Sequence, residues 1–308
     1  MTFNRNACPA GIRRTCFLVS TLLLTASLLR ADVLVWDANN GADGAQDGTG
    51  TWTAGAPNWF NQTQTLQNQS WLNGSDAVFG SGSGTAGTIT LSGPITAGNL
   101  TFSAATSGSY TLGGSGVLTL TNSTITSNVA ATINAVLTGD TAWLKSGAGT
   151  LTLGGGGSNT HTGLVTVNQG LLMLNKTGGA TAVVGNLAIT NGGSVNFADN
   201  TTNQIASNSS VTVSGELSDF NGTGPNAGGV ARVTQTLAAL TMNGGTFNAG
   251  ANSVWNIGSV SYVAGTNRVF VGNSGSVQTY GSLSLVGMNG VATSGSVANG
   301  FTLFGNGA

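Results

Sequence analysis

Side chains that can transfer protons or bind metals are scarce in this sequence. From Asp32 onward the chain has one glutamate (Glu216), one histidine, two lysines and two arginines. Enzymes that cleave polysaccharides need clustered carboxylates, a basic side chain, or a metal held by acids. Asp199 and Asp219 are the best candidates for a carboxylate pair, because their spacing is close to the repeat described below. No basic partner or third acid follows at that spacing, which favours two solvated turn carboxylates.

Two further groups could act as ligands. His161 lies in a Thr-His-Thr turn, where a packing or hydrogen-bonding role is favoured over that of a base or metal ligand. Asp37, Asp43 and Asp47 alternate with Asn and Gly as in calcium loops, but Gly48 stands where such a loop places its bidentate glutamate. A cluster of turns is therefore favoured here. We predict a non-enzyme without catalytic residues, cofactor or metal.

The first thirty-one residues have the pattern of a secretory signal peptide. Arg5, Arg13 and Arg14 precede an apolar run from Cys16 to Leu29, which is shorter than the roughly 20 residues of a membrane span. A general secretory signal is favoured over a twin-arginine one. Cleavage after Ala31 removes both cysteines, so no disulfide is expected. The predicted location is secreted or at the cell surface.

The remaining chain, 32–308, carries little charge. It keeps four basic and nine acidic residues, a formal charge of −5. Such a sparse, slightly acidic surface favours neither nucleic acid nor anionic membrane as a partner.

Short strands separated by glycine turns dominate the composition. The chain has 50 glycines, yet it is rich in aliphatic and β-branched residues, which argues against disorder. Glycine and β-branched residues interrupt every window long enough for a helix. Alternating Thr with Leu or Val, as in Thr150–Leu153, is typical of half-buried strands.

These strands recur at the length of one coil of a parallel β-helix. First strands are expected to start at residues 165, 187, 211, 240 and 269, at intervals of 22, 24, 29 and 29. The pattern predicts that Val167, Ile189, Val213 and Met242 stack inward in one column. A right-handed coil is expected, because parallel crossovers favour it. An antiparallel barrel or sandwich fits less well, because its strands recur every 8–12 residues.

Paired threonines raise the question of an ice-binding face. The pairs do not keep the coil period, which favours ordinary outward strand positions. They are Thr88/Thr90, Thr119/Thr121, Thr124/Thr126 and Thr150/Thr152.

Tryptophans gather near the start of the body. Trp36, Trp52, Trp59 and Trp71 are separated by polar turns, and large aromatic side chains can close the first coil of a solenoid. We predict an N-terminal cap over residues 32–84 and a parallel β-helix over 85–308.

The stretch at about 144–174 resembles the autotransporter-associated β-strand repeat, or passenger-associated transport repeat. The matching residues fall in three blocks: Leu144, Lys145, Gly147, Gly149, Thr150, Leu151 and Leu153; Asn159, Thr160 and Gly163; Thr166, Val167, Gly170 and Leu172. His161 replaces the family's usual Tyr, and Leu164-Val165 replaces a usual Gly-Thr. The resemblance implies a right-handed β-helical passenger segment that aids passage and folding of an autotransporter passenger.

The leading functional hypothesis is an exported stalk or surface-display scaffold. A carbohydrate-active β-helix enzyme and a non-catalytic module that binds glycans or surfaces are the alternatives. An outer-membrane barrel or anchor is a possible partner beyond residue 308. The apolar run Gly300–Phe304 also leads us to expect self-association or fraying at the C-terminal coil.

Overall fold

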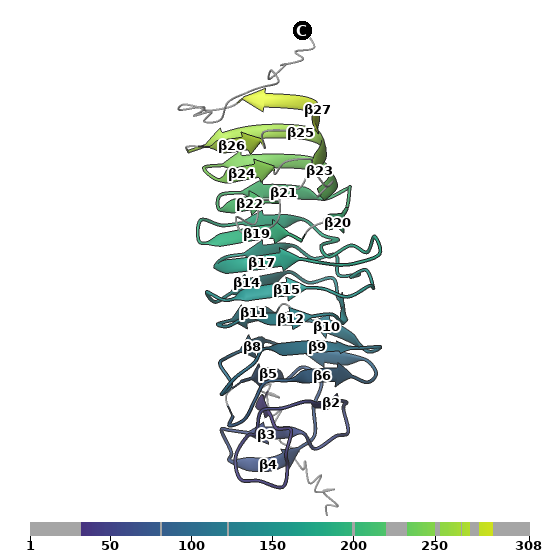
Figure 1. Cartoon of the computed structure of the whole chain (residues 1–308), viewed down its shortest axis with the longest axis vertical. Helices are drawn as coiled ribbons and strands as arrows, with labels where there is room; N and C mark the ends of the chain where they lie inside the picture. Colours follow the sequence, from purple (N-terminus) through teal and green to yellow (C-terminus); the bar gives the residue numbers. More distant parts are fainter. Residues whose placement is uncertain are drawn as a thin grey trace, which may run out of the picture. The chain divides into compact units, whose positions relative to one another are not determined.

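The fold is a parallel β-solenoid. The computed structural model describes residues 32–80, 82–121, 123–198, 201–219, 233–249, 253–265, 267–271 and 277–285. Strands and turns make up this part of the chain, which contains no helix and confirms the all-β class (Figure 1). The predicted signal peptide and the run Gly300–Phe304 lie outside the described residues.

The strands form three sheets, and most coils contribute one strand to each of the two larger sheets. The largest sheet has 14 strands: β1 (Val33–Trp36), β3 (Trp59–Asn61), β4 (Leu66–Gln69), β5 (Asp76–Phe79), β8 (Leu100–Phe102), β11 (Thr124–Ser127), β14 (Trp143–Ser146), β16 (Val165–Val167), β18 (Leu187–Ile189), β20 (Thr201–Thr202), β21 (Ser210–Val213), β23 (Val233–Asn243), β25 (Val254–Ala264) and β27 (Val277–Leu285).

A second sheet has ten strands: β2 (Gly50–Trp52), β6 (Thr88–Leu91), β9 (Tyr110–Gly114), β12 (Ala131–Ile133), β15 (Thr150–Leu153), β17 (Gly170–Leu174), β19 (Gly193–Phe197), β22 (Glu216–Ser218), β24 (Thr246–Ala249) and β26 (Arg268–Val271). The third sheet has three strands: β7 (Ile95–Ala97), β10 (Val117–Leu120) and β13 (Val136–Thr138).

The predicted inward column is confirmed. Val167 pairs in parallel with Ile189, Ile189 with Val213, and Val213 with Met242. All four side chains are buried. The residue between each pair of inward positions is only half-buried, as the period of two along a strand requires.

The predicted fifth first strand is wrong. Val269 lies in β26 of the ten-stranded sheet, where it pairs with Phe247. The position equivalent to Leu240 in the next coil is Val260, in β25. The error arises because β23 and β25 are 11 residues long and run through the position that a corner occupies in earlier coils. Their glycine turns are therefore displaced along the sequence.

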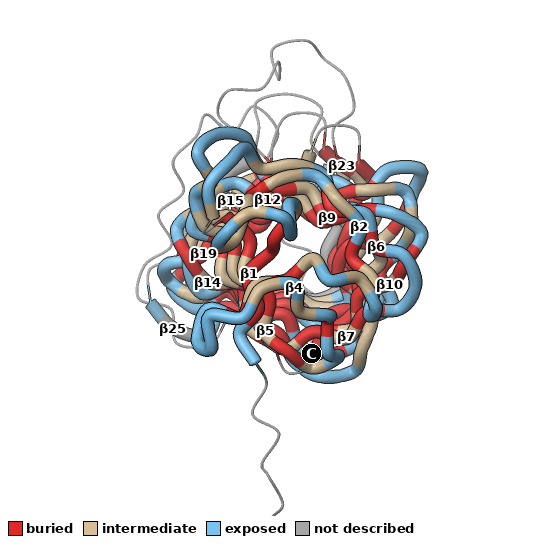
Figure 2. Tube along the Cα trace, turned by 90° about the horizontal axis from the view of Figure 1, so that it is seen from below, coloured by how far each residue is buried: buried red, intermediate tan, exposed pale blue. Residues whose placement is uncertain are grey.

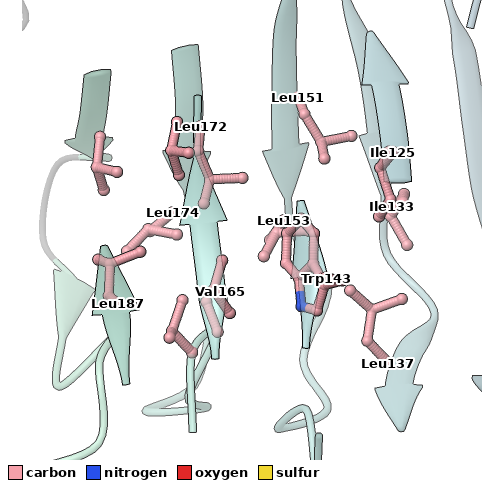
Figure 3. Packing of buried hydrophobic residues seen from close by; sticks show 14 of the residues in the cluster. Ile125, Ile133, Leu137, Trp143, Leu151, Leu153, Val165, Leu172, Leu174 and Leu187 are labelled. Atoms are coloured by element: carbon pink, nitrogen blue, oxygen red, sulfur yellow. The ribbon is translucent and has the colours of Figure 1, made fainter. Parts of the chain in front are cut away.

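The interior between the sheets is filled by aliphatic columns. Leu151 and Leu172 of the ten-stranded sheet face Trp143, Val165 and other inward residues of the opposite sheet (Figure 3). Seen along the stack, buried positions line the inside of the coil and exposed ones lie at its corners (Figure 2). Each fully buried Leu or Val contributes roughly 1.5–3 kcal/mol.

The tryptophan-rich cap is present at the N-terminal end of the stack. Trp36, Trp52 and Trp59 are fully buried, and Trp71 is nearly so. The ring centroids of Trp52 and Trp59 lie 5.1 Å apart, and each lies 4.7 Å from that of Trp71. Strand β3 pairs antiparallel with β1, and β4 pairs antiparallel with β3, so the sheet ends in a hairpin instead of an open parallel edge.

Candidate functional site

The repeat stretch occupies the middle of the solenoid, and several of its residues have an identifiable structural role. Lys145 points inward and is fully buried. Its Nζ donates hydrogen bonds to the carbonyl oxygens of Gly147 (2.6 Å), Gly149 (2.8 Å) and Gln169 (2.9 Å), and to that of Ser146 (3.1 Å). Burial lowers its pKa to about 8. The ammonium thus holds together the glycine turn between β14 and β15 and the equivalent turn of the next coil.

Asn159 ties three coils together. Its Oδ1 accepts a hydrogen bond from the amide of Leu137 at 2.9 Å, and its Nδ2 donates to the carbonyl of Ala182 at 2.8 Å. These partners lie 22 residues before it and 23 residues after it. A buried amide with both ends paired contributes stability, whereas one left unpaired would cost about 1–3 kcal/mol. Asn159 of the repeat therefore links its own coil to the coils before and after it.

The glycines of the repeat allow neighbouring coils to touch. A Cβ at Gly163 would lie 2.0 Å from the carbonyl oxygen of Thr141, and one at Gly149 would lie 2.4 Å from that of Val129. No side chain fits at those separations. Gly170 also has a positive φ of 68°.

His161 packs in the core, as the sequence predicted for its turn. Its imidazole is buried and meets the Trp143 ring edge-on, with centroids 5.9 Å apart. Neither ring nitrogen has a hydrogen-bond partner among the described residues, so its role is packing alone. Burial lowers its pKa to about 4, which keeps the ring neutral.

The two cap aspartates bind backbone amides and a tyrosine. Asp37 Oδ1 accepts hydrogen bonds from the amides of Asn39 and Gln46, and burial raises the pKa of this carboxyl. Asp47 Oδ1 accepts from the hydroxyl of Tyr110 at 2.6 Å and from the amide of Gly80 at 3.1 Å. These bonds fit the predicted turn cluster, and Asp47 additionally joins the cap to β9.

The prediction of a solvated carboxylate is wrong for Asp219. This side chain is buried, and its Oδ2 accepts a hydrogen bond from the indole of Trp255 at 2.9 Å. It directly follows β22, whose last two residues, Leu217 and Ser218, are also buried. Asp199 lies outside the described residues. Within the described ranges, no group of three or more acidic, histidine or cysteine side chains is arranged to hold a metal ion.

Two buried glutamine side chains were not predicted from the sequence. Gln204 is buried and bonds the backbone of Lys176 from both ends of its amide, at 2.7 and 3.0 Å. Gln235 does the same for Ile205, at 3.1 and 2.6 Å. Gln204 lies between β20 and β21, and Gln235 lies within β23. The available signal was a polar residue at an inward position of an alternating run, as in Thr234-Gln235-Thr236.

The buried amine of Lys176 also escaped prediction. Its Nζ has no hydrogen-bond partner among the described residues, in contrast to Lys145. Burial lowers its pKa to about 8. The sequence gives no warning of this, because charged side chains are expected to face solvent.

Comparison with known proteins identifies a relative of this chain. The chain is 32% identical, over 294 residues and 85% of its own length, to the adhesin BmaC autotransporter of Brucella suis biovar 1 (strain 1330). The chain is related to an autotransporter adhesin. It spans 8% of that relative's length. No protein-family model and no solved structure matches the chain.

This relationship and the β-solenoid confirm the resemblance to autotransporter passenger-repeat proteins. Both departures from the passenger repeat are accommodated. His161 fills a buried position, Val165 pairs between Trp143 and Leu187, and Leu164 is exposed. The relationship supports a passenger or display-scaffold role and implies a surface or secreted location. Within the described residues, no helix is long and apolar enough to cross a membrane.

The threonine pairs fall on different faces of the solenoid. Thr88/Thr90 and Thr150/Thr152 lie in the ten-stranded sheet, Thr124/Thr126 in the largest sheet, and Thr119 in the smallest. Single threonines do stack in register, as Thr111, Thr132 and Thr152 show. These columns are half-buried outward positions of ordinary strands.

Proposed function

We propose that this chain is an exported, non-enzymatic scaffold that displays an adhesive surface outside the cell. The observation that carries the proposal is the stacked passenger repeat, in a chain related over most of its length to an autotransporter adhesin. Lys145, Asn159 and the glycines of the repeat all serve the contact between coils. A fold made this way extends by adding coils, which suits a stalk.

Export through the predicted signal peptide, cleaved after Ala31, is part of this proposal. So is an outer-membrane barrel or anchor supplied beyond residue 308. Help with passage and folding of a longer passenger is the role that the repeat suggests for residues 144–174.

Detection at the surface of intact cells tests the display role. Antibodies raised against the folded chain should label intact cells of the organism that encodes it, and external protease should abolish the labelling. A cytoplasmic protein serves as the control and should stay protected. Labelling seen only after cell lysis would contradict surface display.

Attachment tests the adhesive role. Deletion of the codons for residues 32–308 should lower the number of cells that attach to host-cell monolayers or abiotic surfaces, and purified chain should compete with the attachment of wild-type cells. Equal attachment by the deletion strain and by wild-type cells would contradict an adhesive role for the chain.

A further inference from the structure

Three successive glycine turns line a shallow polar groove on the outside of the solenoid. The turns connect β18 to β19, β21 to β22, and β23 to β24, and the open space that they line has a volume of about 270 Å³. The residues that line it are Asn191–Ser194, Ser214–Glu216 and Gly244–Thr246. No aliphatic or aromatic side chain is among them, so the groove suits a hydrophilic ligand.

The floor of the groove is bare backbone because the coils beneath it touch. A Cβ at Gly193 would lie 2.2 Å from the carbonyl oxygen of Val167. At Gly215 it would lie 2.1 Å from that of Thr190, and at Gly245 2.6 Å from that of Val213. Stacking therefore imposes glycine at all three turns. The same requirement removes side chains that would keep a flat ligand away from the chain.

Three polar side chains stand in one outward column beside this floor. Ser194 pairs in register with Glu216, and Glu216 with Thr246. Strand spacing places neighbours of the column about 4.8 Å apart. Glu216 is the chain's single glutamate, and it is half-buried. A carboxylate between two hydroxyls thus lines the groove.

We propose that this groove binds a short stretch of a neutral saccharide chain laid along the solenoid axis. A carboxylate accepts hydrogen bonds from two adjacent ring hydroxyls, and such charge-assisted bonds are the stronger class. The hydroxyls of Ser194 and Thr246 both donate and accept, and so match hydroxyls on the flanking sugar units. Acidic saccharides are disfavoured, because Glu216 and the net charge of residues 32–308 repel them. This inference rests on the proposed adhesive function and assigns it a contact site.

Binding of defined tetrasaccharides to the full chain tests the site. Cellotetraose, maltotetraose and a mannotetraose are titrated by calorimetry and by saturation-transfer NMR, with a heparin-derived tetrasaccharide and a glucosamine tetramer as charged probes. At least one neutral probe should bind saturably, and the heparin fragment should not. Absence of saturable binding by all three neutral probes, or tighter binding of either charged probe, would overturn the proposal.

Matched variants locate the binding. Glu216→Gln keeps the shape and should weaken binding about tenfold, since a charge-assisted bond becomes an ordinary one. Thr246→Val should weaken it about threefold. Thr152→Val changes an outward threonine of the same sheet away from the groove, and should leave binding unchanged. Wild-type affinity in both groove variants would place the ligand elsewhere and refute the assignment.

Cell attachment separates this inference from the function on which it rests. If cells carrying Glu216→Gln attach like wild type while the deletion strain does not, the adhesive role stands and the groove is not its contact site. If the deletion strain attaches normally, the adhesive role fails, whatever the titrations show.

Discussion

At the scale of single residues, the inward column decides which substitutions the solenoid tolerates. Val213 is fully buried between Ile189 and Met242, whereas its neighbour Thr212 points outward and is half-buried. Val213→Asp should lower the free energy of unfolding by about 4 kcal/mol, because it buries an unpaired carboxylate. Thr212→Asp should change it by about 0.5 kcal/mol.

Urea unfolding followed by circular dichroism measures both changes. Position 213 is a cleaner test than 167, since Lys145 precedes Val167 in the column and its ammonium offers a partner to a new carboxylate. Similar losses in the two variants would mean that the strand register is wrong.

The two buried lysines differ in hydrogen bonding and so should differ on substitution. Lys145→Met leaves up to four carbonyls without their donor and should cost about 2 kcal/mol. Lys176→Met removes an amine that has no partner among the described residues and should be neutral or stabilise by about 1 kcal/mol. Thermal unfolding at neutral pH ranks the variants, and a larger loss at Lys176 would contradict the hydrogen-bond assignment.

Stability should also rise with pH above 8. Burial lowers the pKa of both ammonium groups from 10.5 to about 8. Between these values the unfolded chain binds more protons than the folded one, so raising the pH favours the folded state. Urea midpoints measured from about pH 7.5 to about pH 9.5, below tyrosine ionisation, should increase. The double variant Lys145→Met/Lys176→Met should show a flat profile; a slope that survives in it would point to other groups.

At the scale of elements, close contact between turns makes certain glycines irreplaceable. A Cβ at Gly163 would collide with the backbone of Thr141, whereas one at Gly156 would meet nothing closer than 3.7 Å. Gly163→Ala should therefore cost about 3 kcal/mol, and Gly156→Ala should be almost silent. Differential scanning calorimetry of both variants checks this, and equal melting temperatures would show that the turn relaxes around the methyl group.

The cap is fastened to the solenoid through a carboxylate. Asp47→Ala removes the acceptor for Tyr110 and Gly80 and should cost about 2 kcal/mol. Tyr110→Phe keeps the ring and should cost about 1 kcal/mol. Tryptophan fluorescence reports mainly on the cap, since four of the chain's six indoles lie within it. A variant that unfolds without any early fluorescence change would show that the cap does not depend on this bond.

At the scale of the whole solenoid, the strands of each coil pair only with those of the neighbouring coils. Stability in such a stack is close to a sum of coil and interface terms. Gly163→Ala should therefore reduce hydrogen-exchange protection most in the coils around β13 to β18, and least in the cap and β5. Uniform loss of protection along the described strands would indicate a single cooperative unit.

The sequence analysis predicted the stacking better than the interior chemistry. Alternation fixes which face a residue occupies, so Val167 and Ile189 could be placed without the structure. It does not say that an inward position can be polar. Lys145, Gln204 and Gln235 bond backbone groups of neighbouring coils, and Asp219 accepts a hydrogen bond from the indole of Trp255. Each of these side chains bonds a residue that lies 24 to 36 positions away in the sequence. The alternation of polar and apolar residues along one strand does not indicate such distant partners. Val269 was misplaced because β23 and β25 absorb a corner into a continuous strand.

The direction of the ladder hydrogen bonds has a mechanical consequence. In a parallel stack these bonds point from coil to coil, along the axis on which a stalk is pulled. Tension along this axis then breaks the hydrogen bonds of one ladder at a time and does not load many ladders in shear at once. Unfolding one coil of about 22 residues would release roughly 75 Å of extended chain. A tether built this way yields at low force and lengthens coil by coil, so it would absorb a sudden pull before an attached contact breaks.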